Sequence, residues 1–87
     1  GDGNFHFGYL IDPDNADERR VAEELNIKLV TRALKLEGTC TGEHGVGLHK
    51  MGFLLDEAGA GAVDMMRTIK RALDPDNILN PGKIFSV

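Results

Sequence analysis

A glycine-rich stretch from Gly42 to Lys50 contains the residues whose types and spacing could do chemistry. It reads GEHGVGLHK and places an adjacent carboxylate and imidazole, Glu43 and His44, between glycines. Glycine is needed where a backbone turns tightly or comes close to a ligand. A Glu-His pair can ligate a metal ion, transfer a proton, or divide the two tasks between its members. An exposed loop without chemistry is the alternative interpretation of the same residues.

Two phosphate-binding motifs that are built on glycines do not fit this stretch. A P-loop requires Lys and then Ser or Thr directly after the second glycine of a G-x-x-x-x-G frame, but Leu48 and His49 follow Gly47. The dinucleotide fingerprint G-x-G-x-x-G fails because Lys50 stands where the third glycine belongs. The chemistry of the stretch therefore depends on its Glu-His pair.

Composition excludes several classes of function. The net charge is −4 and the isoelectric point is near 5.2, without a cluster of Lys and Arg, so neither nucleic acid nor an anionic membrane is expected as the main partner. A chain of 87 residues with 41% hydrophobic content is sufficient for one small domain. The single cysteine, Cys40, excludes an internal disulfide and is interpreted as a small buried hydrophobe. No apolar run approaches the ~18 residues of a membrane span.

The elements that position the Glu-His pair begin with a strand expected from Phe5 to Ile11. Aromatic and β-branched residues recur there at every second position. One face of the strand is therefore expected to carry Phe5, Phe7, Tyr9 and Ile11. His6 points to the opposite face. Its alternatives are a metal ligand and a hydrogen-bonded strand histidine.

A long helix is expected to follow this strand. Asn15, with Glu18 three residues later, is close to a capping box, and Gly38 suits the position after the C-cap. The charged residues between Glu18 and Lys28 are interpreted as the solvated face. The opposite face carries an apolar stripe broad enough to lie on a sheet, formed by Val21, Ala22, Leu25, Leu29, Ala33 and Leu36.

The second half of the chain predicts a short strand, a loop and a second helix. Residues 39–41 could form a strand that leads into the glycine-rich stretch, and residues 50–55 fit either a helical turn or an extended piece. Asp56 can cap a helix whose first turns are weakened by Gly59 and Gly61. Its apolar stripe consists of Ala62, Met66, Ile69 and Leu73.

Two prolines near the C-terminus predict the end of the second helix and a turn after it. Pro75 predicts that the second helix ends at Asp74, because the residue before proline is disfavoured in the α region. Asn80-Pro81-Gly82-Lys83 places Pro and Gly at the two central positions of a type II turn. Lys83 is therefore expected just beyond a rigid corner.

Three motifs in this order resemble the C-terminal end of the FAD-linked 2-hydroxy acid oxidoreductases. They are GDGNFH at 1–6, GEHGVG at 42–47, and LDP at 73–75 with ILNPGK at 78–83. The family includes the glycolate oxidase flavin subunit, D-lactate dehydrogenase and D-2-hydroxyglutarate dehydrogenase, and belongs to the vanillyl-alcohol oxidase superfamily. The resemblance covers nearly the whole chain.

The resemblance implies an α+β fold with an antiparallel sheet and two packed helices. Residues 1–87 would form the C-terminal part of the substrate-capping domain, with the FAD-binding domain upstream and absent from this chain. The chain begins without Met and inside a motif, which also predicts that it is a piece of a longer protein.

The resemblance also assigns candidate site residues. In many members the first motif reads H-x-G-D-G-N-x-H, and its two histidines, with the Glu of G-E-H-G, ligate a divalent metal such as Zn or Mn. By position, His6 matches the second histidine and Glu43 the carboxylate, whereas the first histidine would precede Gly1. His44 matches the proposed general base. Asn80 and Lys83, from the Asn-Pro-Gly-Lys stretch, are expected to contact the FAD cofactor.

The leading hypothesis is oxidation of a small D-2-hydroxy acid, such as D-lactate or glycolate, by proton abstraction and hydride transfer to flavin. The 2-hydroxyglutarate enzymes carry an Asn two residues after the second histidine, and this chain has Gly8 there. The contact that this Asn makes with the substrate is therefore not expected here. The alternative is a packing or assembly module of a flavoprotein without reactive groups, and a metal-dependent hydrolase is a more distant third. The expected partners are the hydroxy acid and an electron acceptor, either a quinone or an electron-transfer protein. A homo-oligomer and a cytoplasmic location, with or without membrane association through those partners, are compatible with the resemblance.

Overall fold

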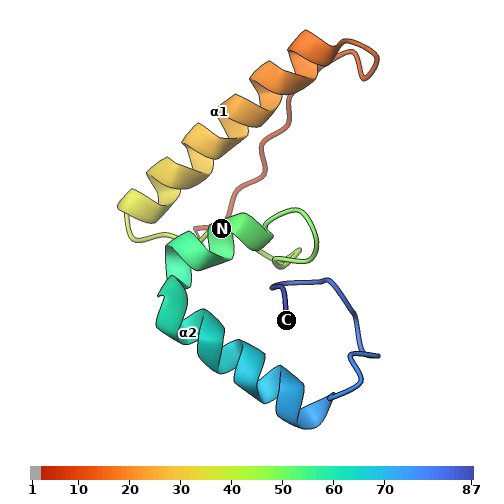
Figure 1. The fold of residues 1–87 in the computed structure, drawn as a ribbon. Coiled ribbons are helices and arrows are strands. Elements are labelled where there is room, and N and C mark those ends of the chain that lie inside the picture. Colours follow the sequence, from red (N-terminus) through yellow and green to blue (C-terminus); the bar gives the residue numbers. More distant parts are fainter. Residues whose placement is uncertain (1–2) are drawn as a thin grey trace. The chain divides into compact units, whose positions relative to one another are not determined.

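The computed structural model describes residues 3–87, in which two helices are formed, α1 (Ala16–Lys35) and α2 (Met51–Leu73) (Figure 1). The chain divides into two compact units, Gly1–Gly42 and Glu43–Val87. Each unit contains one helix and one long stretch without regular secondary structure. Part of the expected N-terminal turn, at residues 1 and 2, lies outside the described residues. Neither described helix is long and apolar enough to cross a membrane.

The expected antiparallel sheet is wrong, because no strand is present in the described part of the chain. Residues 5–11 pass alongside α1 without regular secondary structure (Figure 1). The alternation itself is visible, since the rings of Phe7 and Tyr9 pack edge to face with their centroids 5.1 Å apart. A strand, however, needs a second strand to pair its N–H and C=O groups, and alternation of residue types does not provide one.

The second expected strand, at residues 39–41, is replaced by a local turn. The Thr39 hydroxyl donates to the Thr41 carbonyl oxygen, and the Thr41 N–H donates back to the same hydroxyl over 3.4 Å. A threonine side chain that hydrogen-bonds to nearby backbone groups offers the backbone an alternative to pairing in a sheet. Cys40 between them is buried with 4% of its surface exposed, as the sequence predicted.

The N-terminus of α1 confirms the predicted cap. The Asn15 side chain accepts hydrogen bonds from the N–H groups of Asp17 and Glu18, at 3.0 and 3.1 Å. The Glu18 carboxylate accepts from the N–H of Asp12, at 2.6 Å, instead of from Asn15 as a strict capping box requires. The turn before the helix is therefore held to the first helical turn.

At the C-terminus of α1, Gly38 was predicted directly after the C-cap but lies one residue further along. The C-cap is Leu36, and Glu37 follows it with φ of +64°, so Gly38 is the second residue after the cap. Gly38 N–H donates to Ala33 O (2.8 Å) and Glu37 N–H to Leu34 O (3.1 Å), which is the Schellman pattern. A side chain at position 38 would press on the Ala33 carbonyl oxygen, at 3.0 Å, so the glycine serves close packing there.

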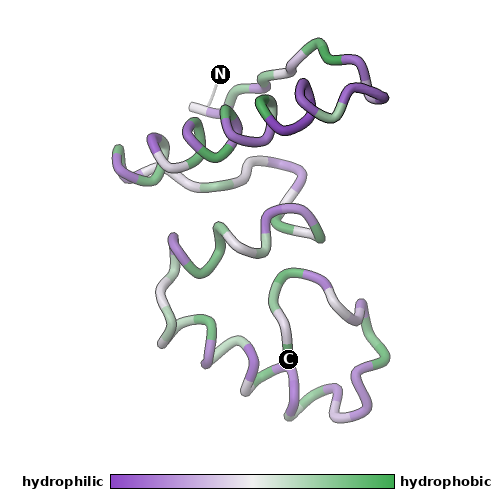
Figure 2. Tube along the Cα trace, turned by 45° about the horizontal axis from the view of Figure 1, so that its top comes forward, coloured by the Kyte–Doolittle hydropathy of each residue, from purple (hydrophilic) through white to green (hydrophobic). Residues whose placement is uncertain are grey.

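The apolar stripe of α1 remains half open within unit 1. Residues 7–11 and the first half of α1 line a shallow groove between them. Val21 and Leu25 nevertheless each keep 43% of their surface exposed, and Leu36 keeps 70%. Figure 2 shows apolar residues recurring along this helix among polar ones. The stripe that was predicted to lie on a sheet is covered only in part.

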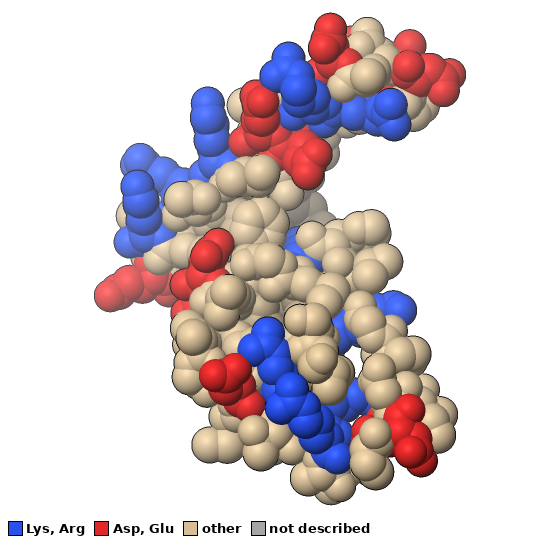
Figure 3. All heavy atoms as spheres, in the orientation of Figure 1, with Lys and Arg blue, Asp and Glu red and all other residues tan. Residues whose placement is uncertain are grey.

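The charged residues of α1 are exposed, as predicted. Acidic and basic side chains are mixed over the first half of the helix in Figure 3, basic ones prevail over its second half, and one ion pair joins Arg20 to Glu24 at 3.0 Å. Such exposed pairs contribute only about 0.3–0.5 kcal/mol each. They indicate a solvated face without chemistry.

α2 begins earlier than predicted and is broken once. It starts at Met51 without a side-chain cap, so residues 51–55 are helical and Asp56 is not the N-cap. Gly59 has φ of +84° and ψ of 162°, which interrupts the helix where the sequence has two glycines close together. The end at Leu73, followed by Asp74 and Pro75, is confirmed. The second half of α2 then turns its Met66, Ile69 and Leu73 toward the C-terminal stretch.

Candidate functional site

The glycine-rich stretch forms a loop that leads directly into α2. Gly45 and Gly47 have φ of +75° and +53°, values that favour glycine, so these two glycines are explained by the backbone turn. The Lys50 N–H donates to the Val46 carbonyl oxygen at 3.3 Å, one residue before the helix begins. This bond closes the turn through which the loop leads into α2.

Gly42, the first glycine of the stretch, is required by the packing of unit 1 and not by a backbone turn. A Cβ atom at this position would lie 2.4 Å from Oδ1 of Asn4, so the Asn4 side chain occupies the space that any larger residue would need. The close approach expected from the sequence is therefore to another part of the chain. It places the Asn4 side chain beside Gly42, the residue that immediately precedes Glu43.

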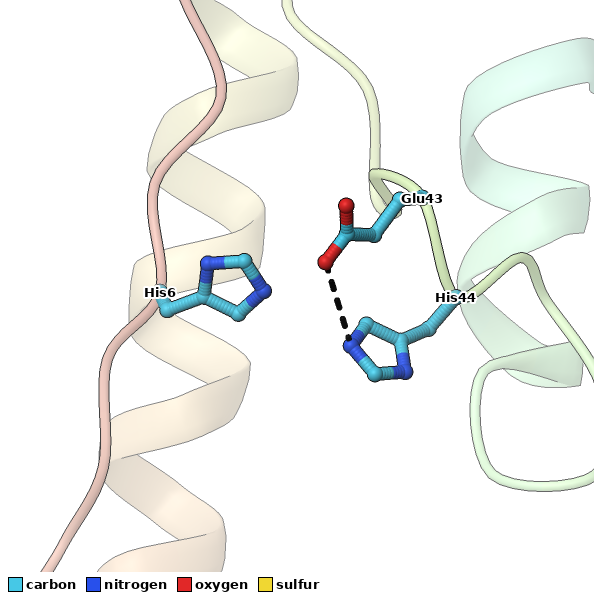
Figure 4. Close-up of side chains that lie close together, drawn as sticks. All are labelled: His6, Glu43 and His44. Atoms are coloured by element: carbon cyan, nitrogen blue, oxygen red, sulfur yellow. Dashed lines mark ion pairs between the residues drawn. The ribbon is translucent and has the colours of Figure 1, made fainter. Parts of the chain in front are cut away.

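Glu43 and His44 form an ion pair at the start of unit 2, with 3.6 Å between Oε1 of Glu43 and Nε2 of His44 (Figure 4). Both side chains are well exposed, His44 to 76% and Glu43 to 66%. A carboxylate beside an imidazole can orient the ring and stabilise its protonated form. The pair can therefore accept a proton from a bound ligand, or offer a carboxylate oxygen and a ring nitrogen to a cation.

His6 lies on the irregular stretch of unit 1, two residues after Asn4, and its side chain is exposed (Figure 4). It was predicted to sit on a strand, and no strand is formed there. Of the three residues predicted for metal binding and proton transfer, Glu43 and His44 thus lie together in unit 2, and His6 lies in unit 1.

Asn80 and Lys83 flank the predicted corner of unit 2. Residues 81 and 82 form a turn, and Gly82 has φ of +73°, the value that the second central position of a type II turn requires. Both residues line a cavity of about 460 Å³. Most of its other walls are apolar and come from α2 and the C-terminal end, including Met66, Ile69, Leu73, Leu79, Ile84, Phe85 and Val87.

Sequence reasoning missed one residue pair beside this cavity, Lys70 and Asp74. The Lys70 ammonium and the Asp74 carboxylate are in direct contact, and Asp74 is 9% exposed. The hydrogen bond from Lys70, with further ones from the N–H groups of Ile78 and Leu79, lowers the pKa of Asp74 to about 2. Their i, i+4 spacing at the end of a helix was the signal that could have found them.

The chain belongs to the family of FAD linked oxidases, C-terminal domain, whose model matches residues 1–84. The motifs and the loop geometry described above fall within that match. The family description names FAD as the cofactor of these oxidases.

Among its relatives, the chain is 52% identical over 85 residues to the mitochondrial D-lactate dehydrogenase [cytochrome] of Arabidopsis thaliana. It is 43% identical over 86 residues to the glycolate oxidase subunit GlcD of Bacillus subtilis. It is 40% identical over 89 aligned positions to the D-2-hydroxyglutarate dehydrogenase of Xanthomonas citri pv. viticola. These alignments cover 98%, 99% and 98% of this chain but only 15%, 18% and 18% of the relatives.

Proposed function

We propose that this chain is the C-terminal, site-bearing part of an FAD-dependent dehydrogenase that oxidises a small D-2-hydroxy acid. The observation that carries the proposal is the Glu43–His44 pair on a glycine-rich loop, in a chain that belongs to the FAD-linked oxidases. Oxidation of an alcohol carbon requires loss of the hydroxyl proton together with a hydride. The chain contributes the proton acceptor, and the flavin accepts the hydride when it is bound.

His44 is the proposed proton acceptor. An imidazole is the side chain that most often serves as a general base near neutral pH. Glu43, 3.6 Å away, stabilises the imidazolium that forms when the proton arrives. The exposure of both side chains in these 87 residues means that the dry surroundings of a reaction site would come from the FAD-binding part of the protein.

His6 and Glu43 are the proposed ligands of a divalent cation. One imidazole and one carboxylate suit Zn or Mn, and a catalytic zinc site normally takes three protein ligands, so a third would come from outside this chain. A cation held there would lower the pKa of the substrate hydroxyl. Within unit 1, Asn4, which precedes His6 by two residues, packs against Gly42, which directly precedes Glu43 in the sequence.

Asn80 and Lys83 are the proposed contacts to an anionic or hydrogen-bonding group of the flavin. Both line the cavity of unit 2, and Lys83 brings an ammonium group to a largely apolar wall. Lys83 is exposed, so its positive charge is accessible to an anionic group.

D-Lactate is the proposed substrate and a cytochrome the proposed electron acceptor. Identity is 52% to D-lactate dehydrogenases named for a cytochrome, from a plant and from yeasts, against 43% and 36% for the glycolate oxidase subunits. A cytochrome is an electron-transfer protein, which favours that expectation over a quinone. We extend the proposal to a mitochondrial location, which the names of the plant and yeast relatives state.

The test is the visible spectrum of the intact flavoprotein that contains this chain, recorded without oxygen before and after addition of D-lactate, glycolate and D-2-hydroxyglutarate in turn. The expected result is bleaching of the flavin bands by D-lactate within the time of mixing. Bleaching by another acid would reassign the substrate. A flavin that stays oxidised with all three would contradict the proposed activity.

The metal ligands are tested by His6→Gln and Glu43→Gln, with Glu23→Gln on the exposed face of α1 as the matched control. Each ligand variant is expected to lower bound Zn or Mn, measured by elemental analysis, and to lower turnover by about 10- to 100-fold. The control is expected to change neither. Full metal content in both ligand variants would remove the site from this loop.

An assembly role is the second candidate, and the half-open apolar stripe of α1 favours it. A side chain such as Leu25 that is 43% exposed stabilises the protein further when another part of it covers the stripe. If the chain only packs against the flavin domain, His44→Gln and Glu43→Gln should retain full turnover, whereas Leu25→Asp should release the flavin. If the chain supplies the base, His44→Gln should lose turnover and keep its flavin.

A further inference from the structure

The C-terminal stretch of unit 2 is tied to α2 at its beginning. Both oxygens of the Asp74 carboxylate accept backbone N–H groups, from Ile78 at 3.0 Å and from Leu79 at 2.9 Å. The Lys70 ammonium contacts the same carboxylate and also donates to the Leu79 carbonyl oxygen at 2.6 Å. One ion pair therefore fixes both backbone polar groups of Leu79, the residue directly before the Asn80–Lys83 turn.

The same stretch is tied to the glycine-rich loop at its other end. The Ile84 N–H donates to the Gly47 carbonyl oxygen at 2.7 Å, which joins residues 37 positions apart in the sequence. Ile84 has φ of +69°, and the Phe85 N–H donates to the Lys83 carbonyl oxygen at 2.8 Å, so Ile84 is the centre of a γ-turn. This conformation is costly for a β-branched residue and persists only where the surrounding structure imposes it.

Between these two ties, the backbone that carries Lys83 has little freedom to move. Pro81 fixes its own φ, and Gly82 completes the turn. Within residues 3–87, the Lys83 ammonium has one hydrogen-bond acceptor, the Pro81 carbonyl oxygen at 3.4 Å, and this long contact leaves donor capacity for a ligand. Lys83 thus lines the cavity from a backbone that is held on both sides.

We infer that Asp74 and Lys70 are positioning residues, which hold the Asn80–Lys83 turn so that the Lys83 ammonium meets an anionic group of the flavin or of the substrate. The inference rests on the proposed function. Paired side chains that are only 8% and 18% exposed contribute little net stability, because removing two charges from water offsets their attraction. Such a pair is better suited to selecting one geometry, and the geometry here is that of the turn.

The experiment is a double-mutant cycle in the intact flavoprotein with Asp74→Asn, Lys83→Ala and the double variant. Asp76→Asn, an exposed acid two residues away, is the matched control. Asp74→Asn is expected to lower kcat/KM for D-lactate by about 10- to 100-fold, the size of effect that a small misplacement causes. In the Lys83→Ala background the same substitution is expected to have less than a threefold effect, because the group that it positions is absent.

Two further measurements separate the sources of the anion. A weaker flavin dissociation constant with unchanged KM in both single variants would place Lys83 on the cofactor, and a raised KM with unchanged flavin affinity would place it on the substrate carboxylate. Either result supports the inference. Equal effects of Asp74→Asn in the two backgrounds would show a general structural role and overturn it, as would full activity of Lys83→Ala.

Failure of the proposed function is recognised separately. If no hydroxy acid reduces the wild-type flavin, the cycle is read in the flavin dissociation constant, where non-additivity supports the inference and additivity overturns it.

Hydrogen exchange tests the hydrogen bonds from the Ile78 and Leu79 N–H groups to the Asp74 carboxylate. These two amides are expected to be protected in the wild type and in Asp76→Asn, and to exchange at least tenfold faster in Asp74→Asn. Unprotected amides in the wild type would overturn the inference.

Discussion

Unit 1 and unit 2 each combine one helix with one long irregular stretch, but the two stretches are held in different ways. Residues 75–87 of unit 2 are tied by Asp74, by Lys70 and by the Gly47 carbonyl oxygen. Residues 3–11 of unit 1 lie along a helix whose apolar stripe stays half exposed. A turn-rich stretch can be completed by nearby polar groups, whereas a strand-like stretch needs another strand.

The candidate chemistry follows the same division. Glu43, His44, Asn80 and Lys83 are in unit 2, and His6 is in unit 1. The comparison therefore predicts that unit 2 carries most of the reactivity and that unit 1 mainly provides a surface for packing. Substitutions that affect turnover and stability separately can test that division.

The largest effect is expected from the proposed base in unit 2. His44→Gln should lower kcat of the intact flavoprotein by about 10²- to 10⁴-fold with the flavin retained, because general bases contribute on that order. His49→Gln, an exposed histidine of the same loop, is the control and should stay within twofold of the wild type. Equal losses in the two variants would mean that the loop matters only for its fold.

A pair of glycine substitutions tests the break in α2. Gly59→Ala should destabilise the protein by about 1–3 kcal/mol, because alanine is strained at φ of +84° and ψ of 162°. Gly61→Ala lies within the helix, two residues away, and should stabilise it by about 0.5–1 kcal/mol. No neighbouring atom would contact the added methyl group at either position, so backbone conformation alone accounts for the opposite signs. The check is the change in Tm, and a gain in Gly59→Ala would show that α2 is continuous.

The cap of α1 tests whether unit 1 affects stability without affecting chemistry. Asn15→Ala should cost about 1 kcal/mol, because the N–H groups of Asp17 and Glu18 lose their acceptor. Turnover at a temperature well below Tm should be unchanged. Thr31→Ala, an exposed position in the same helix, is the control for substitution by alanine and should not lower Tm. A loss of turnover in Asn15→Ala would place part of the reactive site in unit 1.

The smallest effect at neutral pH concerns the acid stability of unit 2. The hydrogen bond from Lys70 lowers the pKa of Asp74 from 3.8 to about 2 in the folded protein. The folded state binds the proton less readily than the unfolded state, so this contribution is complete above pH 3.8 and is lost as the pH falls through about 2. Urea unfolding across that range should show a steeper loss of stability in the wild type than in Asp74→Asn. If the free energy of unfolding falls equally with pH in both proteins, the charge of Asp74 does not hold residues 75–87.

The elements encoded by neighbouring residues were predictable from the sequence. Asn15 caps α1, Pro75 follows the end of α2, and Gly82 has the φ that its turn requires. Each of these depends on groups within a few positions of one another, so residue identity and spacing suffice. The Glu43–His44 pair was visible for the same reason, since its two members are adjacent.

The features that tertiary structure decided involve partners far apart in the sequence. The pattern at residues 5–11 predicted a strand, but pairing depends on a second strand, and the described residues contain none. Gly42 is explained by Asn4, and Ile84 takes its strained φ while bonded to Gly47. The sequence alone determined which groups could react and where the chain turns. Contacts between distant residues decided which of those groups are held, because such contacts depend on the path of the whole chain.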